Sequence, residues 1–426
     1  MAAAVATSMN VAVNGRANET RVTASKYALP LLLTTSMFIN YIDRSNLSIA
    51  APLMQKDMGL TTAQIGVLSS AFFWTYALFQ LVGISGWLCD RFRVTMVFGI
   101  SALVWGLSTL VTGFLSSFWA IFAMRLILGA GESFAYPCYS RILATDVPQT
   151  SRGTANAFLD AASKLGPSVG MFLGGMLLVR FDWRIFFVVL GVISLAWVVP
   201  WFLFAARSSS SPINKPVSGG SVARILSSRS AWGTFAGHFC GNYVWFFLLI
   251  WLPSYLVKDK GLSTQAMANV GSIAFLVIAI GTLCAGWLSD RYIRRGVSPT
   301  IVRKSVVVGG LLGSASILVV GYVQSASFSL AMLLFACFAF GTYTSNHWAI
   351  TQTIAGPAMA GRWTGLQNGI GNFSGIVASW LTGELATQTG SFRTSFVMTG
   401  LIALAGACMW GIVVGPVREL PVDKES

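Results

Sequence analysis

Continuous apolar runs of about 20 residues recur along the chain and constrain its fold more than any other feature. A run of this length without alternating polar residues is typical of a transmembrane helix and not of a barrel strand. Only 10% of the 426 residues are charged, whereas a soluble protein carries roughly 25%. A water-soluble shell cannot be built from this composition, so the sequence predicts an all-α membrane protein.

The runs predict twelve transmembrane helices, with edges defined to within a few residues. They cover residues 27–52, 65–87, 94–115, 118–140, 154–179, 184–205, 232–256, 267–288, 302–323, 328–350, 363–386 and 394–415. Of the 28 Lys and Arg residues, 19 fall on the side of the N-terminus and 6 on the opposite side. Because positive charge is retained on the inner side, we expect both termini in the cytoplasm. The net charge of +14 therefore sets orientation and does not predict nucleic-acid binding.

A basic stretch rich in Ser, Pro and Gly separates the first six spans from the last six and is typical of a flexible linker. The expected organisation is a cytoplasmic tail (1–26), a six-helix half (27–206), a cytoplasmic linker (207–231), a second six-helix half (232–415) and a cytoplasmic tail (416–426).

The two halves share an internal repeat. Residues 86–92 read GWLCDRF and residues 286–292 read GWLSDRY, while KDMGLTT at 56–62 matches KDKGLST at 258–264. Two matches at nearly the same offset predict halves of one topology, related by a pseudo-two-fold axis along the membrane normal. This arrangement is found in transporters that rock around a central site.

The repeated loop also resembles a family signature. Gly86-x3-Asp90-Arg91 and its copy Gly286-x3-Asp290-Arg291 are similar to the loop motif of the major facilitator superfamily. The resemblance implies that Asp90, Arg91, Asp290 and Arg291 are gating residues that do not contact substrate. Arg93 departs from the motif, which usually has Gly at that position.

Three further motifs resemble the anion:cation symporter family within this superfamily. They are NYIDRSNL at 40–47, Arg125-x3-Gly129-x-Gly131-Glu132 with Pro137, and Trp251-Leu252-Pro253. That family includes proton-coupled carriers of galactonate, glucarate, hexuronate, tartrate and phthalate. The resemblance covers residues 27–415 and implies a monomeric carrier in a bacterial inner membrane. It also implies that Tyr41 and Tyr76 lie near the substrate.

Six charged residues lie away from the edges of the predicted spans, where each costs about 2.5–3.5 kcal/mol on insertion and so indicates function. The cations are Arg44, Arg125 and Lys164, and the anions are Asp43, Glu132 and Asp160. Their charges sum to zero. Arg44 and Arg125 lie about 12 and 10 Å below the outer ends of their spans by helical rise. We therefore expect the two guanidinium groups to converge on one substrate anion.

Arginine binds a carboxylate through paired hydrogen bonds, and apolar surroundings help a carboxyl group to hold a proton. We expect Asp43 and Glu132 to occupy the arginines while ionised and to release them on protonation, which predicts proton coupling. The alternative is a set of salt bridges that only holds helices together. Lys164 and Asp160, spaced i, i+4, either pair with each other or leave Lys164 to bind the second carboxylate of a diacid.

Polar side chains at mid-membrane depth suit a hydroxylated substrate such as a sugar acid. These are Tyr41, Tyr76, Asn242, Tyr243 and Asn372. Their alternative role is hydrogen bonding between helices. His238 and His347 are interpreted as packing residues, with a proton relay as the alternative.

We expect a secondary active transporter that imports an organic anion, a sugar acid or a dicarboxylate, by proton symport with rocker-switch alternating access. The alternatives are an organic anion exchanger and a transporter-like nutrient receptor. The sequence lacks a nucleotide-binding loop, a metal-ligand cluster and a nucleophile–base pair, so we predict no enzymatic activity, no cofactor and no metal. The expected partners are the organic anion, the proton and the lipid bilayer of the cell membrane.

Overall fold

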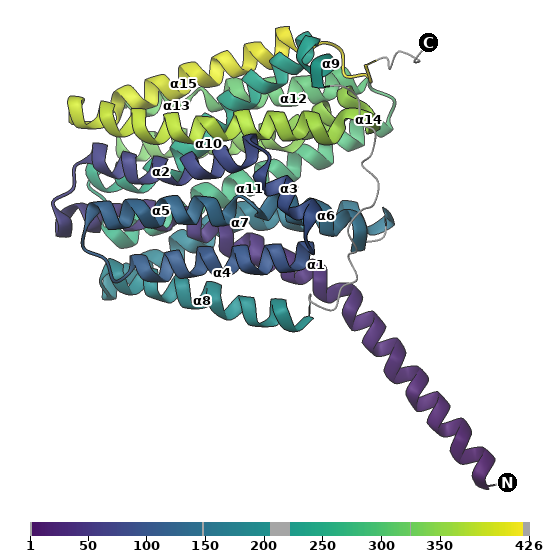
Figure 1. The fold of residues 1–426 in the computed structure, drawn as a ribbon. Coiled ribbons are helices and arrows are strands. Elements are labelled where there is room, and N and C mark those ends of the chain that lie inside the picture. Colours follow the sequence, from purple (N-terminus) through teal and green to yellow (C-terminus); the bar gives the residue numbers. More distant parts are fainter. Residues whose placement is uncertain (1, 147–148, 205–221, 324, 421–426) are drawn as a thin grey trace.

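The computed structural model describes residues 2–146, 149–204, 222–323 and 325–420, and this part of the chain is helical without strands (Figure 1). The side chains of residues 2–28 and 144–157, and of a few other positions including Asp90, lie outside the described residues.

The first half contains α1 (Ala2–Met58), α2 (Thr62–Leu81), α3 (Ile84–Arg91), α4 (Val94–Thr112), α5 (Phe118–Glu132), α6 (Ala135–Asp146), α7 (Gln149–Arg180) and α8 (Trp183–Phe204). The second half contains α9 (Val222–Ser227), α10 (Arg229–Lys258), α11 (Thr264–Arg294), α12 (Pro299–Ser314), α13 (Ile317–Val320), α14 (Ala326–Thr389), α15 (Arg393–Cys408) and the π-helix η2 (Met409–Val413).

The predicted spans fall on these helices, with local breaks that hydropathy did not predict. The second, fourth and ninth spans are each divided in two, as α2–α3, α5–α6 and α12–α13. Helix α14 holds both the tenth and the eleventh span and changes direction at Gly356, whose φ of 62° lies in the left-handed region that glycine tolerates. The first span also continues to Met58, six residues beyond its predicted edge at residue 52.

Nine helices in the described part of the chain are long and apolar enough to cross a membrane. The three predicted spans that do not meet this criterion are 27–52, 65–87 and 363–386. Each of them contributes at least one polar residue to a central cavity described below. The count of twelve spans therefore stays a prediction.

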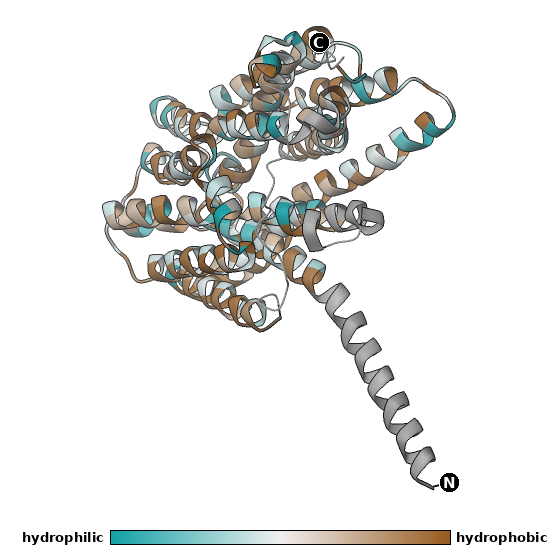
Figure 2. Ribbon diagram, turned by 45° about the vertical axis from the view of Figure 1, so that its right-hand side comes forward, coloured by the Kyte–Doolittle hydropathy of each residue, from teal (hydrophilic) through white to brown (hydrophobic). Residues whose placement is uncertain are grey.

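The outer surface of the bundle is apolar, as expected for a protein that faces lipid. Figure 2 shows hydrophobic residues along the helices of the bundle, and large side chains such as Trp119, Leu283 and Ile412 are 72%, 66% and 71% exposed. A soluble monomer rarely exposes contiguous apolar surface on this scale, so the fold is that of a membrane-embedded helical bundle.

The repeated KDxGLxT segment forms the same turn in both halves. Gly59 and Gly261 have φ of 65° and 64° and end the preceding helix in the left-handed conformation. Two residues later, the Thr61 hydroxyl accepts a hydrogen bond from the Gln64 amide. The Ser263 hydroxyl likewise caps α11. These caps satisfy backbone donors that the start of a helix leaves unpaired.

The aspartate of each repeat ties the first helix of its half to the last. The Asp57 carboxylate accepts hydrogen bonds from Trp183 Nε1 at 3.1 Å and Arg184 Nη1 at 2.7 Å, at the start of α8. The Asp259 carboxylate accepts from the Phe392 amide at 2.8 Å, directly before α15. Both halves therefore close in the same way, in agreement with the internal repeat.

The halves meet along α1 and α10, α2 and α14, and α7 and α11. Three hydrogen bonds of 2.8 Å join them toward the ends that the sequence predicts to be outside: Ser48 Oγ to the Leu249 carbonyl, Lys258 Nζ to Thr62 Oγ1, and the Ala63 amide to Thr387 Oγ1. Glycines allow the close approach, because a Cβ atom on Gly66 would lie 2.7 Å from the Ser379 carbonyl oxygen. This end of the interface is thus closely packed.

Candidate functional site

A cavity of about 670 Å³, including its open mouth, lies between the two halves. Its walls come from α1, α2, α6 and α7 of the first half and from α10 and α14 of the second. The lining residues are Tyr41, Arg44, Tyr76, Tyr136, Asp160, Lys164, His238, Asn242, Trp245, Phe246, Phe340, Tyr343, Thr344, His347, Trp348, Asn368 and Asn372.

Arg44 is the cation that α1 brings to this cavity, although its side chain is only 4% exposed. Its Nε donates to Glu132 Oε2 at 2.8 Å. The guanidinium carbon lies 4.9 Å from the ring centre of Tyr41 and 4.7 Å from that of Tyr76. Aromatic faces and one carboxylate therefore surround the guanidinium, while Nη2 has no hydrogen-bond partner among the described residues.

Arg125 lies behind the cavity wall. It is 4% exposed and is absent from the described cavity lining. Its Nε donates to the Leu68 carbonyl at 3.3 Å. The Phe72 ring lies 5.3 Å from the Arg125 guanidinium and 5.4 Å from that of Arg44. In this conformation Phe72 thus contacts both cations, and only Arg44 reaches the cavity.

The two predicted proton carriers are fully buried. Asp43 and Glu132 are 1% and 0% exposed. Asp43 Oδ2 accepts a hydrogen bond from Ser194 Oγ at 2.9 Å, whereas Asp43 Oδ1 and Glu132 Oε1 have no aligned partner among the described residues. Arg125 lies within electrostatic range of both carboxylates. The cluster therefore holds two cations and two anions with unused hydrogen-bonding capacity, which is costly in a buried site.

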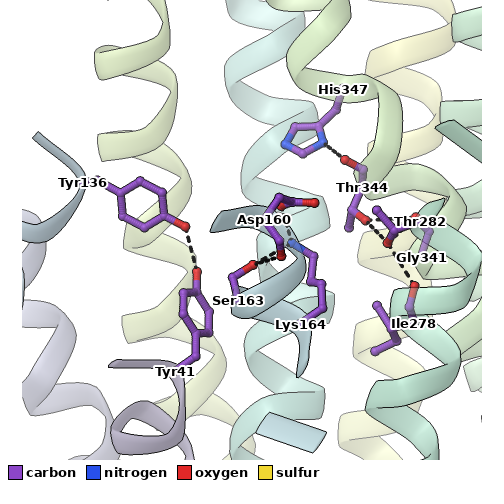
Figure 3. Close-up of polar contacts among 10 residues, drawn as sticks. All are labelled: Tyr41, Tyr136, Asp160, Ser163, Lys164, Ile278, Thr282, Gly341, Thr344 and His347. Atoms are coloured by element: carbon purple, nitrogen blue, oxygen red, sulfur yellow. Dashed lines mark hydrogen bonds and ion pairs between the residues drawn. The ribbon is translucent and has the colours of Figure 1, made fainter. Parts of the chain in front are cut away.

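Lys164 and Asp160 pair with each other and also lie at the cavity. Lys164 Nζ contacts Asp160 Oδ1 at 2.8 Å and donates to Ser163 Oγ at 3.1 Å (Figure 3). Both residues also line the cavity. The Lys164 side chain is 14% exposed, and its Nζ lies 6.0 Å from the ring centre of Trp245 in the second half.

Four of the five predicted uncharged lining residues lie at the cavity, whereas Tyr243 is buried and is absent from the described cavity lining. Tyr41 and Tyr76 line the first half, and the Tyr41 hydroxyl is 3.1 Å from that of Tyr136 (Figure 3). In the second half, Asn372 Nδ2 donates to the Asn368 carbonyl at 2.8 Å. Asn242 Nδ2 lies 3.3 Å from His238 Nε2.

The sequence interpretation missed most of the second-half wall, including its two histidines. His238 and His347 both line the cavity, with ring centres 5.0 Å apart and planes 16° from parallel. His347 Nδ1 lies 3.1 Å from the Thr344 carbonyl (Figure 3). Helical spacing offered a signal, because His238, Asn242 and Trp245 are spaced i, i+4 and i+7 and share one helix face.

The predicted gating residues lie at the ends of α3 and α11, away from the cavity lining. Arg91, Asp290 and Arg291 are exposed, and the Arg291 guanidinium lies 5.3 Å from the ring centre of Trp287. Asp90 lies outside the residues with described side chains. Their gating role stays a prediction.

No metal centre is apparent in the part of the chain that the structure describes, where no three His, Cys, Asp or Glu side chains gather closely enough to hold an ion.

Comparisons with known proteins place this geometry in a family. The family model described as the Major Facilitator Superfamily matches residues 33–379. A probable galactarate/D-glucarate transporter of Bacillus subtilis (strain 168) is 30% identical over 93% of this chain and 93% of its own length. A probable galactarate/D-glucarate transporter of Escherichia coli (strain K12) is also 30% identical, over 94% of this chain and 97% of its own.

The fold is also similar to a solved structure. The crystal structure of a bacterial homologue of the human lysosomal transporter Spinster, in an inward-facing and occupied conformation, superimposes with a TM-score of 0.77. The superposition covers 92% of this chain and 97% of that chain at 17% sequence identity.

Proposed function

The chain belongs to the Major Facilitator Superfamily, a family of multi-pass membrane transporters, and we propose that it imports an organic anion by proton symport. The substrate class is a sugar acid or a dicarboxylate. The protein works as a monomer in the bacterial inner membrane with both termini in the cytoplasm, and a rocking movement of the two halves exposes the cavity to each side in turn.

One observation carries this proposal: Arg44 is both a lining residue of the cavity and the ion-pair partner of the buried Glu132. A substrate carboxylate and the Glu132 carboxylate compete for the same guanidinium. When Glu132 takes up a proton, Arg44 becomes available to the substrate. When Glu132 loses that proton, it takes Arg44 back and the substrate is released, so the two fluxes are coupled.

Asp43 and Arg125 extend this charge balance behind the wall. With two cations and two anions, the buried cluster is neutral when empty, and one substrate carboxylate with one proton keeps it neutral when occupied. Neutrality matters because an unpaired charge at this depth is expensive. Symport of a monoanion with one proton is therefore electroneutral and is driven by the pH gradient alone.

The cavity and the relatives together support the proposed substrate class. Two curated relatives at 30% identity are named galactarate/D-glucarate transporters. Galactarate and glucarate are hydroxylated dicarboxylates. Arg44 and Lys164 supply two cationic groups for two carboxylates, while tyrosine hydroxyls and asparagine amides around the cavity supply hydrogen bonds for hydroxyl groups.

Alternating access is supported by where the halves touch. Lys258 and Thr62 join the halves at the ends that we place outside, whereas Asn368 Nδ2 and Gln80 Oε1 meet at 3.3 Å nearer the ends that we place inside. The contacts at the outer ends support a conformation that is closed toward the outside. Transport requires these contacts to break while the inner ends approach each other.

Uptake into liposomes tests the proposal. The purified protein is reconstituted and given labelled glucarate, galactonate, hexuronate and phthalate, with and without an inward proton gradient. We expect gradient-driven accumulation of a sugar acid that a protonophore abolishes. Glu132→Gln, which imitates the protonated state, should retain exchange of substrate across the membrane but lose gradient-driven accumulation.

The two alternatives give different results in the same assay. Uptake that ignores the gradient but needs a counter-anion inside the vesicles would identify an exchanger and overturn the proton role of Glu132. Binding without any flux in either direction would identify a receptor.

A further inference from the structure

The second-half wall of the cavity contains a stack of three rings. Tyr343 and His347 of α14 have ring centres 5.0 Å apart and planes 17° from parallel. His347 and His238 of α10 continue the stack at 5.0 Å and 16°. Trp348 lies against both imidazoles, with ring centres 4.7 and 4.8 Å away. Each imidazole is therefore fixed on its faces by other rings.

Glycines make room for this stack. A Cβ atom on Gly371 would lie 2.3 Å from His238 Cδ2, and one on Gly241 would lie 2.2 Å from the Tyr343 hydroxyl. The rings consequently fit against bare helix backbone on α14 and α10. Such close packing holds side chains in single rotamers and pre-organises the polar atoms that they present.

The hydrogen bonds of His347 define what it offers to a ligand. Its Nδ1 faces the Thr344 carbonyl, an acceptor, so Nδ1 carries the hydrogen. In the neutral tautomer fixed by this bond, Nε2 is an acceptor with a free lone pair. That atom is buried and has no partner among the described residues, although His347 lines the cavity. An unsatisfied buried acceptor at a cavity wall is suited to a ligand donor.

We propose that His347 Nε2 accepts a hydrogen bond from a hydroxyl group of the substrate, and that the His238–His347–Tyr343 stack makes the carrier selective for hydroxy acids. The proposal rests on the proposed function and specifies its substrate class. Ionised carboxylates cannot donate to Nε2, so they bind at the cations of the first half, Arg44 and Lys164. His238 acts as a positioning residue that holds the His347 ring in place.

This division explains how a cavity that already has two cations can reject simple diacids. Adipate and glucarate have the same six-carbon chain and the same two carboxylates, but only glucarate has hydroxyl groups. A site built to hydrogen-bond a hydroxyl loses that bond with the analogue lacking it, and the acceptor is then left unpaired. The ratio of the affinities for glucarate and adipate therefore depends on the second-half wall and not on the cations of the first half, which bind both acids alike.

Binding to the purified protein in detergent tests the proposal without relying on proton coupling. Displacement of labelled glucarate is measured with unlabelled glucarate and adipate, and with the monoacid pair gluconate and hexanoate. We expect His347→Phe, which keeps a ring in the stack but removes the acceptor, to weaken glucarate binding about tenfold or more. Adipate affinity should change less than threefold, so the preference for the hydroxy acid collapses.

Two further variants separate the acceptor from the packing. His347→Gln retains an acceptor oxygen and should keep part of the preference. His238→Phe continues the stack and should reduce the preference less than His347→Phe does. Size-exclusion profiles and unfolding temperatures identify any variant that fails to fold. If His347→Phe or His238→Phe fails, His347→Gln replaces the first and Gly371→Ala, in which the added methyl group displaces His238, replaces the second.

Each outcome bears on the proposal. Glucarate binding with an unchanged preference in His347→Phe overturns the role of His347 but leaves organic-anion transport intact. Equal losses for glucarate and adipate would assign His347 to packing. If none of the four acids binds the native protein, both this inference and the proposed substrate class are wrong.

Discussion

The two walls of the cavity differ in kind. The first half contributes Arg44, Lys164 and Asp160 to the lining, with Asp43, Arg125 and Glu132 buried near Arg44. The described lining residues of the second half include no Asp, Glu, Lys or Arg. They are aromatic rings, amides, a hydroxyl and two histidines instead.

This difference assigns energy coupling to the charged wall of the first half and recognition of the substrate's hydroxyl groups to the neutral wall of the second. Charges buried in a membrane protein need partners close by, and helices of one half can supply them without relying on contacts that break during rocking. The neutral wall of the second half can meet and leave the substrate without exposing an unpaired charge.

The largest effect is expected in the charged half. Arg44→Met should abolish transport and lower the free energy of unfolding by about 3–5 kcal/mol, because Glu132 is left buried and unpaired. The double variant Arg44→Met, Glu132→Leu should recover most of that stability but no transport. Chemical unfolding in detergent and liposome uptake measure the two quantities. If Arg44→Met is as stable as the native protein, the buried pair of Arg44 and Glu132 does not stabilise the first half.

The second-largest effect is expected where the two halves move against each other as rigid bodies. A Cβ atom on Gly175 of α7 would lie 2.0 Å from the Ala268 Cβ of α11. The larger side chain in Gly175→Leu should therefore destabilise the outwardly closed conformation by about 1–3 kcal/mol. This energy corresponds to a roughly five- to 150-fold smaller population of that conformation. We expect uptake to fall accordingly while substrate still binds from outside.

Gly309→Leu is the matched control for this change, since a Cβ atom on the exposed Gly309 meets no atom within 4 Å. Similar losses in both variants would mean that added bulk, and not blocked closure, impairs transport.

Lys164 tests whether the first half also distinguishes diacids. Lys164→Gln should weaken binding of glucarate about tenfold through loss of a charge-assisted contact and weaken gluconate far less. Asp160→Asn removes the partner at 2.8 Å while keeping the cation, so it should retain diacid binding. Equal losses for both acids in Lys164→Gln would assign this residue to the pair with Asp160.

The smallest effect is expected at the outer ends, where the two halves are alike. Hydrogen bonds from Arg184 and Trp183 hold the pKa of Asp57 below its usual range. The resulting stabilisation is present above the unfolded-state pKa of about 4 and is lost as pH falls through the lower folded-state value.

Asp57→Asn should therefore leave uptake within about twofold of native and cause a small loss of stability near pH 7 that vanishes at low pH or high salt. A large loss of transport would make this exposed pair part of the mechanism. Unfolding temperatures of Asp57→Asn and the native protein, measured across pH and salt concentration, test the expected change in stability.

Local sequence was sufficient for much of the fold. Apolar runs predicted the helices, and the repeated KDxGLxT segment predicted two halves of one topology. The structure adds the paired turns at Gly59 and Gly261, which form because helix ends and left-handed glycines depend on neighbouring residues. Asp160 and Lys164 form the i, i+4 contact that their spacing allows, for the same reason. The breaks within α2–α3 and α5–α6 were missed because hydropathy averages over them.

The sequence by itself determined that this chain is a two-part helical membrane protein whose rare buried charges include Asp43, Arg44 and Glu132. Only the tertiary structure decided which of them reaches the cavity. Arg44 does so and Arg125 does not, because Phe72 and the packing of α1, α2 and α5 separate them. The imidazole stack likewise depends on α10 meeting α14 at Gly371, a contact between residues 133 positions apart that no local pattern encodes.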